Sequence, residues 1–243
     1  MMQKPKMLLF DYGQTLVDEE KFDGVRGTEA VMNYCVVNKH NLTAERIQEE
    51  ADRINKELGR FEPDKKHFFE VEAPNHMFTA YLYESLGIEL SISSEEIDRV
   101  FWDAAAPGKP TEHAEEFLDF LWQNGIRSGV ISNISFAGKV VKERIDRLLP
   151  DNHFEFVIAT SEYLFRKPNR RIFDLALEKA GISPEDAWYV GDNYECDIAG
   201  AKRAGIFPVR YLGASEGRRG SEADILTVAN WNELEKIILH TET

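Results

Sequence analysis

The sequence contains little cysteine and no long hydrophobic run. Its 243 residues include two cysteines, Cys35 and Cys196, which lie far apart. They form neither a disulfide framework nor a CxxC or Cys/His metal-binding spacing, and a reducing compartment is therefore expected. No apolar stretch approaches the roughly 20 residues that cross a bilayer. The short apolar run before Asp11 cannot form a signal-peptide core. We therefore expect a soluble cytoplasmic protein.

Positive charge is also scarce. The chain carries 29 Lys and Arg against 43 Asp and Glu, which gives a net charge of −14. Nucleic acids and anionic membranes both attract positive surfaces, so we expect neither as a main partner. An anionic small molecule must instead meet a local basic pocket. The sequence also lacks GxGxxG, the fingerprint of dinucleotide-binding hydride-transfer enzymes.

The most informative stretch that is present runs from Met7 to Leu16. Its first four residues, Met7 to Phe10, are apolar and predict a short strand buried on both faces. Asp11 follows at once, which would place its carboxylate at the strand's carboxyl end, where open α/β sheets bind ligands. Gly13 allows a sharp turn or a close approach to a ligand. Taken alone, the stretch also fits a strand that ends in an Asx-turn.

Two patterns divide the rest of the chain. Residues 18–106 show helical stripes of apolar residues, with a capping box at Ser93 and Glu96, and no clear alternation of strands and helices. Beyond this block, short apolar strands alternate with amphipathic helices, which indicates βαβ units and a parallel sheet. The sequence therefore predicts an α/β fold. A Rossmann-like core (1–17 and 107–243) would carry a helical cap domain (18–106) inserted after the first strand.

Polar residues follow several of these predicted strands: Asp11, Ser132, Asn133, Lys167, Asp192 and Asp197. Neighbouring parallel strands would bring them to one edge of the sheet. Three close carboxylates repel one another unless a cation lies among them, and oxygen ligands of this kind suit Mg²⁺. A lysine and a hydroxyl beside a metal suit a phosphoryl group.

Four segments, FDYGQT, VISN, RKPNRRIF and GDNYECD, occur in this order at the ends of predicted strands. Together they resemble the four motifs of the haloacid dehalogenase (HAD) superfamily. The helical insert resembles the C1-type cap of that family. The similarity extends from Met7 to about Trp231, which is nearly the whole chain.

The resemblance implies a Mg²⁺-dependent phosphatase that acts on a small phosphorylated metabolite. Asp11 would be the nucleophile and form an aspartyl-phosphate. The ligands of Mg²⁺ would be Asp11, Asp192 and the carbonyl of Gly13, and Asp197 would hold the water shell of the metal. The transferring phosphoryl oxygens would contact Ser132 and Lys167, and Asn133 would support the loop.

Each motif also has an ordinary structural interpretation. Ser132 and Asn133 fit a helix cap, and Lys167 fits a surface lysine before a proline. Asp197 fits a helix N-terminus, where the dipole favours an acid. FDYGQT alone fits the phosphate loop of the actin and sugar-kinase superfamily, but the chain lacks the second DxGxT that this fold needs.

One position departs from the family pattern. Phosphatases of this family usually carry a second Asp, a general acid and base, where this chain has Gly13, and the usual following Gly is Gln14. We therefore expect slow protonation of the leaving group and accumulation of the phosphoenzyme. A side chain from elsewhere could replace the missing group, and those suggested by the sequence are Asp18, Glu19, His67 and His76.

Two other interpretations of the sequence are a protein with little turnover and a dehalogenase. The rival interpretation is a binding or regulatory protein that uses the HAD scaffold with little turnover, and Gly13 is its main support. The dehalogenase branch of the family works without a metal. Retention of Asp192 and Asp197 argues against that branch.

Overall fold

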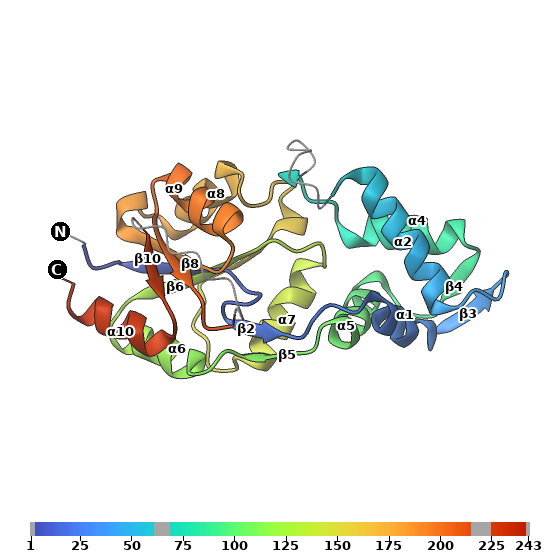
Figure 1. Ribbon diagram of the computed structural model, residues 1–243, viewed down its shortest axis with the longest axis horizontal. Helices are drawn as coiled ribbons and strands as arrows, with labels where there is room; N and C mark the ends of the chain where they lie inside the picture. The colour runs from blue at the N-terminus through green and yellow to red at the C-terminus, as the bar shows by residue number, and fades with distance from the viewer. Residues whose placement is uncertain (1–2, 61–68, 215–224, 242–243) are drawn as a thin grey trace.

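The structure is a computed structural model that describes residues 3–60, 69–214 and 225–241. Its centre is a six-stranded sheet whose strands are all parallel, in the order β10-β9-β8-β1-β6-β7 (Figure 1). The strands are β1 (Met7–Phe10), β6 (Arg127–Ser132), β7 (Val157–Ala159), β8 (Ala187–Gly191), β9 (Phe207–Tyr211) and β10 (Leu226–Val228). The predicted α/β, Rossmann-like fold is confirmed.

The strand β1 shows why this sheet forms. Its four side chains are fully buried and alternate between the two faces of the sheet. Leu8 and Phe10 belong to the hydrophobic core on one face, whereas Met7 and Leu9 belong to the core on the other. A strand apolar at every position is stable only where helices cover both faces.

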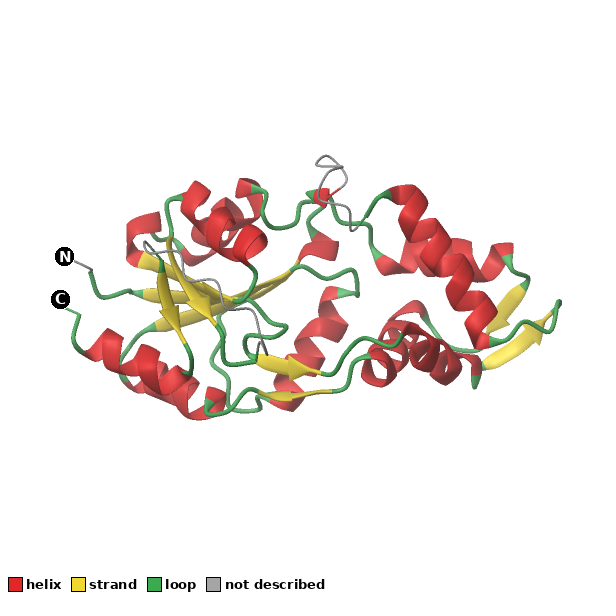
Figure 2. Ribbon diagram, viewed as in Figure 1, coloured by secondary structure: helices red, strands yellow, loops and turns green. Residues whose placement is uncertain are grey.

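Helices cover the two faces of the sheet (Figure 2). The core that contains Phe10 is completed by α6 (Ala114–Gln123), α7 (Gly138–Leu148) and α10 (Trp231–Leu239). The other face packs against α8 (Arg170–Ala180) and α9 (Gly200–Ala204). Short 3₁₀ turns, η1 (Thr160–Glu162) and η2 (Pro184–Asp186), and a π-helical turn, η3 (Tyr194–Ala199), complete this part of the chain.

The segment between β1 and β6 contains α1 (Gly24–Met32), α2 (Ala44–Leu58), α4 (Asn75–Ser85) and α5 (Ser94–Ala105), with a hydrophobic core of its own. The predicted capping box of Ser93 and Glu96 starts α5. The expectation of helices only was wrong, because β3 (Cys35–Asn38) and β4 (Ile88–Leu90) form an antiparallel pair. Both strands are short and partly exposed, so they lack the long buried run that marks a strand in sequence.

Two short strands connect this helical segment to the sheet. The outgoing strand β2 (Val17–Glu19) pairs antiparallel with the returning strand β5 (Gly108–Pro110). In Figure 1 they lie between the sheet and the helical lobe. Across the described ranges, no helix has both the length and the apolar character needed to cross a membrane.

Candidate active site

The side chain of Lys167 is the centre of the polar cluster at the carboxyl edge of the sheet. Its Nζ donates to Asp11 Oδ1 at 2.6 Å, to Asp197 Oδ1 at 2.7 Å and to the Tyr189 hydroxyl at 2.7 Å. The lysine is only 1% exposed. It is therefore not a surface lysine, and the structure brings it together with two of the predicted acids.

The backbone of the Lys167 loop is fixed by Asn133. Its Nδ2 donates to the Lys167 carbonyl at 2.7 Å, and its Oδ1 accepts from the Lys167 amide at 2.8 Å. Ser132 is the last residue of β6 and is buried at the same edge. Asn133 thus joins the end of β6 to the loop before α8.

Asp197 is held from several sides on the π-helical turn η3. Its Oδ1 accepts from Lys167 and from the Tyr189 hydroxyl at 3.2 Å, and its Oδ2 accepts from the Asn193 amide at 2.9 Å. Its carboxyl group packs on Gly191, where an added Cβ would come within 2.5 Å of Asp197 Cγ. A glycine at this strand end is therefore required for Asp197 to take its place.

Three acids of the cluster could share one metal ion. Asp11, Asp192 and Asp197 each offer a carboxylate oxygen, and these oxygens lie within 4.8 Å of one another. Burial raises the pKa of Asp11 to about 8, with Asp197 and Asp192 adding to the effect of burial and Lys167 opposing it. Burial acts to lower the pKa of Lys167, but Asp11 and Asp197 outweigh it and hold that pKa above its usual range.

The charge balance fits a divalent cation. Three carboxylates face the single ammonium of Lys167, and like charges this close strongly disfavour full ionisation. An all-oxygen donor set matches the preference of Mg²⁺. The residues present therefore fit such a metal, whereas a ligand role for the Gly13 carbonyl stays a prediction.

These residues surround a cavity of about 220 Å³. Its walls come from the loops after β1, β6 and β8, the loop before α8, and the linking strand β2. The lining residues are Asp11, Tyr12, Gly13, Glu19, Ser132, Asn133, Ile134, Arg166, Lys167, Asp192, Asn193, Cys196 and Asp197. All the predicted catalytic and metal-site residues thus line one cavity.

A fourth carboxyl group, that of Glu19 on β2, enters the cavity from the side of the helical segment. Its Oε1 accepts from Trp102 Nε1 at 2.8 Å and lies 3.3 Å from Arg144 Nη2. Arg144 also donates to the Tyr12 hydroxyl and to the Ala106 carbonyl, and it pairs with Asp103. Burial raises the pKa of Glu19, although Arg144 and Trp102 favour its charged form.

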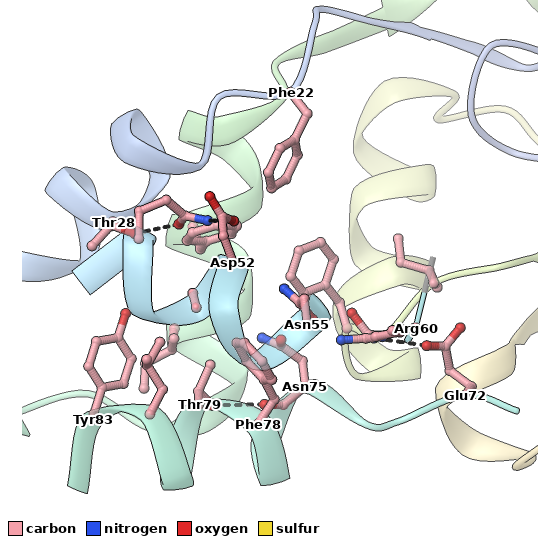
Figure 3. A pocket seen from close by; sticks show the side chains of 18 of the residues that line it. Phe22, Thr28, Asp52, Asn55, Arg60, Glu72, Asn75, Phe78, Thr79 and Tyr83 are labelled. Carbon is pink, nitrogen blue, oxygen red and sulfur yellow. Dashed lines mark hydrogen bonds and ion pairs between the residues drawn. The ribbon is translucent and has the colours of Figure 1, made fainter. Parts of the chain in front are cut away.

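A larger chamber of about 420 Å³ adjoins this cavity, and Asn133, Ile134 and Arg166 line both. Its other walls come largely from α1, α2, α4 and α5. In Figure 3 the phenyl rings of Phe22 and Phe78 face the chamber. Arg60 and Glu72 lie toward one end of that view and Tyr83 toward the other. The chamber therefore offers both aromatic and polar contacts.

The segment around Glu72 ties the helical region to the sheet region at this chamber. Glu72 Oε1 accepts from Arg60 Nη2 at 2.8 Å, and its Oε2 accepts from Thr160 Oγ1 at 3.0 Å. Arg166 Nη1 lies 3.5 Å from Glu72 Oε2. Glu72 is 2% exposed, so its charge is compensated by partners within the protein.

The comparison with family models decides the family. The model of the haloacid dehalogenase-like hydrolases matches residues 5–205, which is most of the chain. The chain belongs to this hydrolase family. The resemblance drawn from the four motifs is thereby confirmed.

Individual relatives of this hydrolase carry phosphatase names. This chain is 28% identical over 238 residues to a glyceraldehyde 3-phosphate phosphatase of Methanocaldococcus jannaschii. The alignment covers 96% of each chain. The chain is 35% identical over 119 residues to a protein of the same name from Methanopyrus kandleri. That alignment covers 48% of this chain and 47% of the relative, so it spans about half of that protein.

A solved structure shows the same fold over the full length. The 2-haloacid dehalogenase of Pseudomonas syringae pv. Tomato matches 98% of this chain and 99% of its own, with a TM-score of 0.65 and 20% identity. At this identity the likeness concerns the fold alone.

Sequence reasoning missed Tyr189 and Arg144. A signal for each was available, since both are polar groups at positions that face a core. Tyr189 lies within a fully buried strand, where its hydroxyl needs a partner. Arg144 shares the buried stripe of α7 with Val140, Val141 and Ile145.

Proposed function

We propose that this hydrolase is a metal-dependent phosphatase that acts on a small phosphorylated metabolite through an aspartyl-phosphate on Asp11. The observation that carries the proposal is the buried ammonium of Lys167, which bridges Asp11 and Asp197 beside Asp192. A fixed positive charge next to a carboxylate nucleophile suits an anionic phosphoryl group. The phosphatase names of the relatives agree with it.

Each residue of the site has its own role in the proposed reaction. Asp11 attacks phosphorus in line with the departing ester oxygen, and a P–O bond to Asp11 forms as the bond to the leaving group breaks. Lys167 and the hydroxyl of Ser132 hold the phosphoryl oxygens, and Asn133 fixes the backbone that carries Lys167. Water then attacks the aspartyl-phosphate, which releases inorganic phosphate and restores Asp11.

The proposed cofactor is Mg²⁺, held by Asp11, Asp192 and Asp197. When bound there, it would offset the negative charge that these carboxylates and the phosphoryl group bring together. The protein's own contribution would be three carboxylate oxygens that lie within 4.8 Å of one another.

The organic part of the substrate would occupy the chamber of about 420 Å³. This volume lies within the range of ordinary small-molecule sites. The chamber adjoins the catalytic cavity, since Asn133, Ile134 and Arg166 line both. We expect a carbon skeleton that contacts the rings of Phe22 and Phe78 while its phosphate reaches Lys167.

A screen of phosphate monoesters with purified protein tests this function. The panel should include triose phosphates, sugar phosphates and nucleoside monophosphates, each with Mg²⁺ and with excess chelator. We expect Mg²⁺-dependent phosphate release by the wild type and none by Asp11→Asn. Ligand binding without release of phosphate would instead support the rival function, a regulatory protein on the same scaffold, which Gly13 favours.

A further inference from the structure

We infer that Glu19 serves as the general acid and base of this site, in place of a side chain at position 13. The inference rests on the proposed phosphatase function. It assigns to a residue on the linking strand β2 a step that Asp11, Lys167 and the metal-site acids do not perform.

The first observation is where the Glu19 carboxyl group lies. A Cβ added to Gly13 would come 3.3 Å from Glu19 Oε2, which is tighter than most real contacts. The carboxyl group of Glu19 therefore fills the space that a side chain at position 13 would enter. Glu19 and Gly13 line the same cavity as the nucleophile Asp11.

The second observation is that this carboxyl group has a fixed orientation. Trp102 and Arg144 both bind Oε1, at 2.8 and 3.3 Å, so the neighbouring Oε2 is the oxygen turned toward Gly13. The Glu19 side chain is 18% exposed and that of Arg144 is 3% exposed. A proton carrier held in this way loses little conformational entropy when a substrate binds.

The other groups that line the cavity are less suited to the step. Asp11, Asp192 and Asp197 form the metal-binding group, and Lys167 is buried between two of them. The Tyr12 hydroxyl already accepts from Arg144 at 2.8 Å. Burial raises the pKa of the Cys196 thiol to about 11, so the thiol stays protonated at neutral pH and is a poor proton donor. Among the described lining residues, Glu19 is the remaining carboxyl group.

The structure also separates Glu19 from the other groups that the sequence suggested. Asp18 does not line the cavity, and its carboxylate lies 3.8 Å from Lys109 Nζ on β5. His76 lines neither the cavity nor the chamber. His67 lies outside the described residues.

The step balances as follows. As Asp11 Oδ bonds to phosphorus and the P–O bond of the ester breaks, Glu19 Oε2–H gives its proton to the ester oxygen, and the alcohol leaves neutral. The Glu19 carboxylate then takes a proton from water while the water oxygen attacks phosphorus. The bond between phosphorus and Asp11 breaks, inorganic phosphate leaves, and Glu19 is protonated again. The sum is one phosphate monoester and one water to one alcohol and one phosphate.

The test is the dependence of rate on the leaving group. Nitrophenyl phosphates have leaving groups that depart without a proton, whereas alkyl phosphates need one. We expect Glu19→Gln to lower kcat/KM by about 10²–10⁴-fold on alkyl phosphates and far less on nitrophenyl phosphates. Loss of the base should also slow breakdown of the aspartyl-phosphate, which would appear as a burst of nitrophenol.

The matched control is Asp103→Asn. Asp103 is another carboxylate that pairs with Arg144, but it does not line the cavity. This variant should keep the leaving-group dependence of the wild type and show no burst. A structural role of the ion pair to Arg144 would instead give both variants the same profile, and that result would overturn the inference.

A relocation of the carboxyl group tests the same idea without relying on Glu19→Gln alone. Glu19→Ala removes the group and opens the space beside Gly13, and the added change Gly13→Asp places a carboxyl group there. We expect the double variant to hydrolyse alkyl phosphates at least tenfold faster than Glu19→Ala. Equal rates for the two would count against Glu19. A wild type that hydrolyses no phosphate ester overturns the phosphatase proposal itself and this inference with it.

Discussion

At the scale of single residues, Lys167 sets the charge of the site. Its ammonium contacts Asp11 and Asp197, and Asp192 adds a third carboxylate to the same group. The ammonium of Lys167 cannot balance three ionised carboxylates, and burial together with the other two carboxylates raises the pKa of Asp11, so a cation that joins them should also stabilise the folded protein. The stability of the protein thus reports on the metal independently of catalysis.

Asp192→Asn should remove this stabilisation. At a Mg²⁺ concentration of about 100 times Kd, binding to the native state alone adds about 2.7 kcal/mol to the free energy of unfolding. We expect MgCl₂ to raise the thermal midpoint of the wild type and to leave that of Asp192→Asn nearly unchanged. Circular dichroism should show the same fold, and Mg²⁺-dependent activity should disappear. An equal rise of the thermal midpoint in both proteins would show that Asp192 is not a ligand of the metal.

At the scale of secondary-structure elements, the sheet could be predicted because its signal is local. Leu8–Phe10, Val130–Ile131 and Trp188–Val190 are short apolar or aromatic runs, and a polar residue follows each within two positions. Because parallel strands end at one edge, Asp11, Ser132 and Asp192 were expected to meet if their strands were neighbours, as β8, β1 and β6 are. The π-helical turn that carries Asp197 continues the same edge.

The features that the sequence did not predict depend on contacts between segments that lie far apart in the sequence. The pair β3–β4 joins residues about 50 positions apart through short, partly exposed strands. Glu19 could be named as a possible acid, but its selection over Asp18 depends on the side chains of Trp102 and Arg144. Contacts between distant segments of this kind leave no periodic pattern in the sequence.

The end of β8 provides a test at this scale. Gly191→Ala would bring a Cβ to 2.5 Å from Asp197 Cγ and so displace Asp197 within η3. We expect a loss of about 1–3 kcal/mol in the free energy of unfolding, together with loss of activity and of stabilisation by Mg²⁺.

Gly125→Ala is the control for this change. Gly125 has a φ of 67° and open space around it, so the variant should cost about 1–2 kcal/mol through backbone strain alone. Its activity and its response to Mg²⁺ should stay unchanged. Full activity in Gly191→Ala would show that Asp197 does not need its present position.

At the scale of the whole molecule, we propose that residues 18–106 form a cap domain that moves over the core (1–17 and 107–243) and excludes water from the site. The strands β2 and β5 are the two chain crossings between these parts. Glu72 supplies a further contact through Arg60, Thr160 and Arg166. The position of the cap thus depends on a buried ion-pair cluster as well as on the linking strands.

Glu72→Gln tests how much that cluster contributes to the stability of the protein. Removing one charge from a buried pair costs about 3–5 kcal/mol, because the partner charge stays buried. We expect a loss of that size in the free energy of unfolding, measured in urea, and a raised KM because the chamber is lined by Glu72. The matched control is Glu143→Gln, whose exposed pair with Arg99 at 2.7 Å should contribute 1 kcal/mol or less. Similar losses in the free energy of unfolding of both variants would show that the buried cluster contributes no more to stability than an exposed ion pair.

The two partners of Glu19 come from different helices, although both side chains pack in or against the core of the sheet region. Trp102 belongs to α5 in the helical segment, and Arg144 belongs to α7 against the sheet, yet both hold the same carboxylate oxygen. We expect a shift of α5 relative to α7 to lengthen at least one of these two bonds. If the helical segment moves over the core as proposed, the orientation of the Glu19 carboxyl group would change with it, so that closure of the site and positioning of its proton donor would occur together.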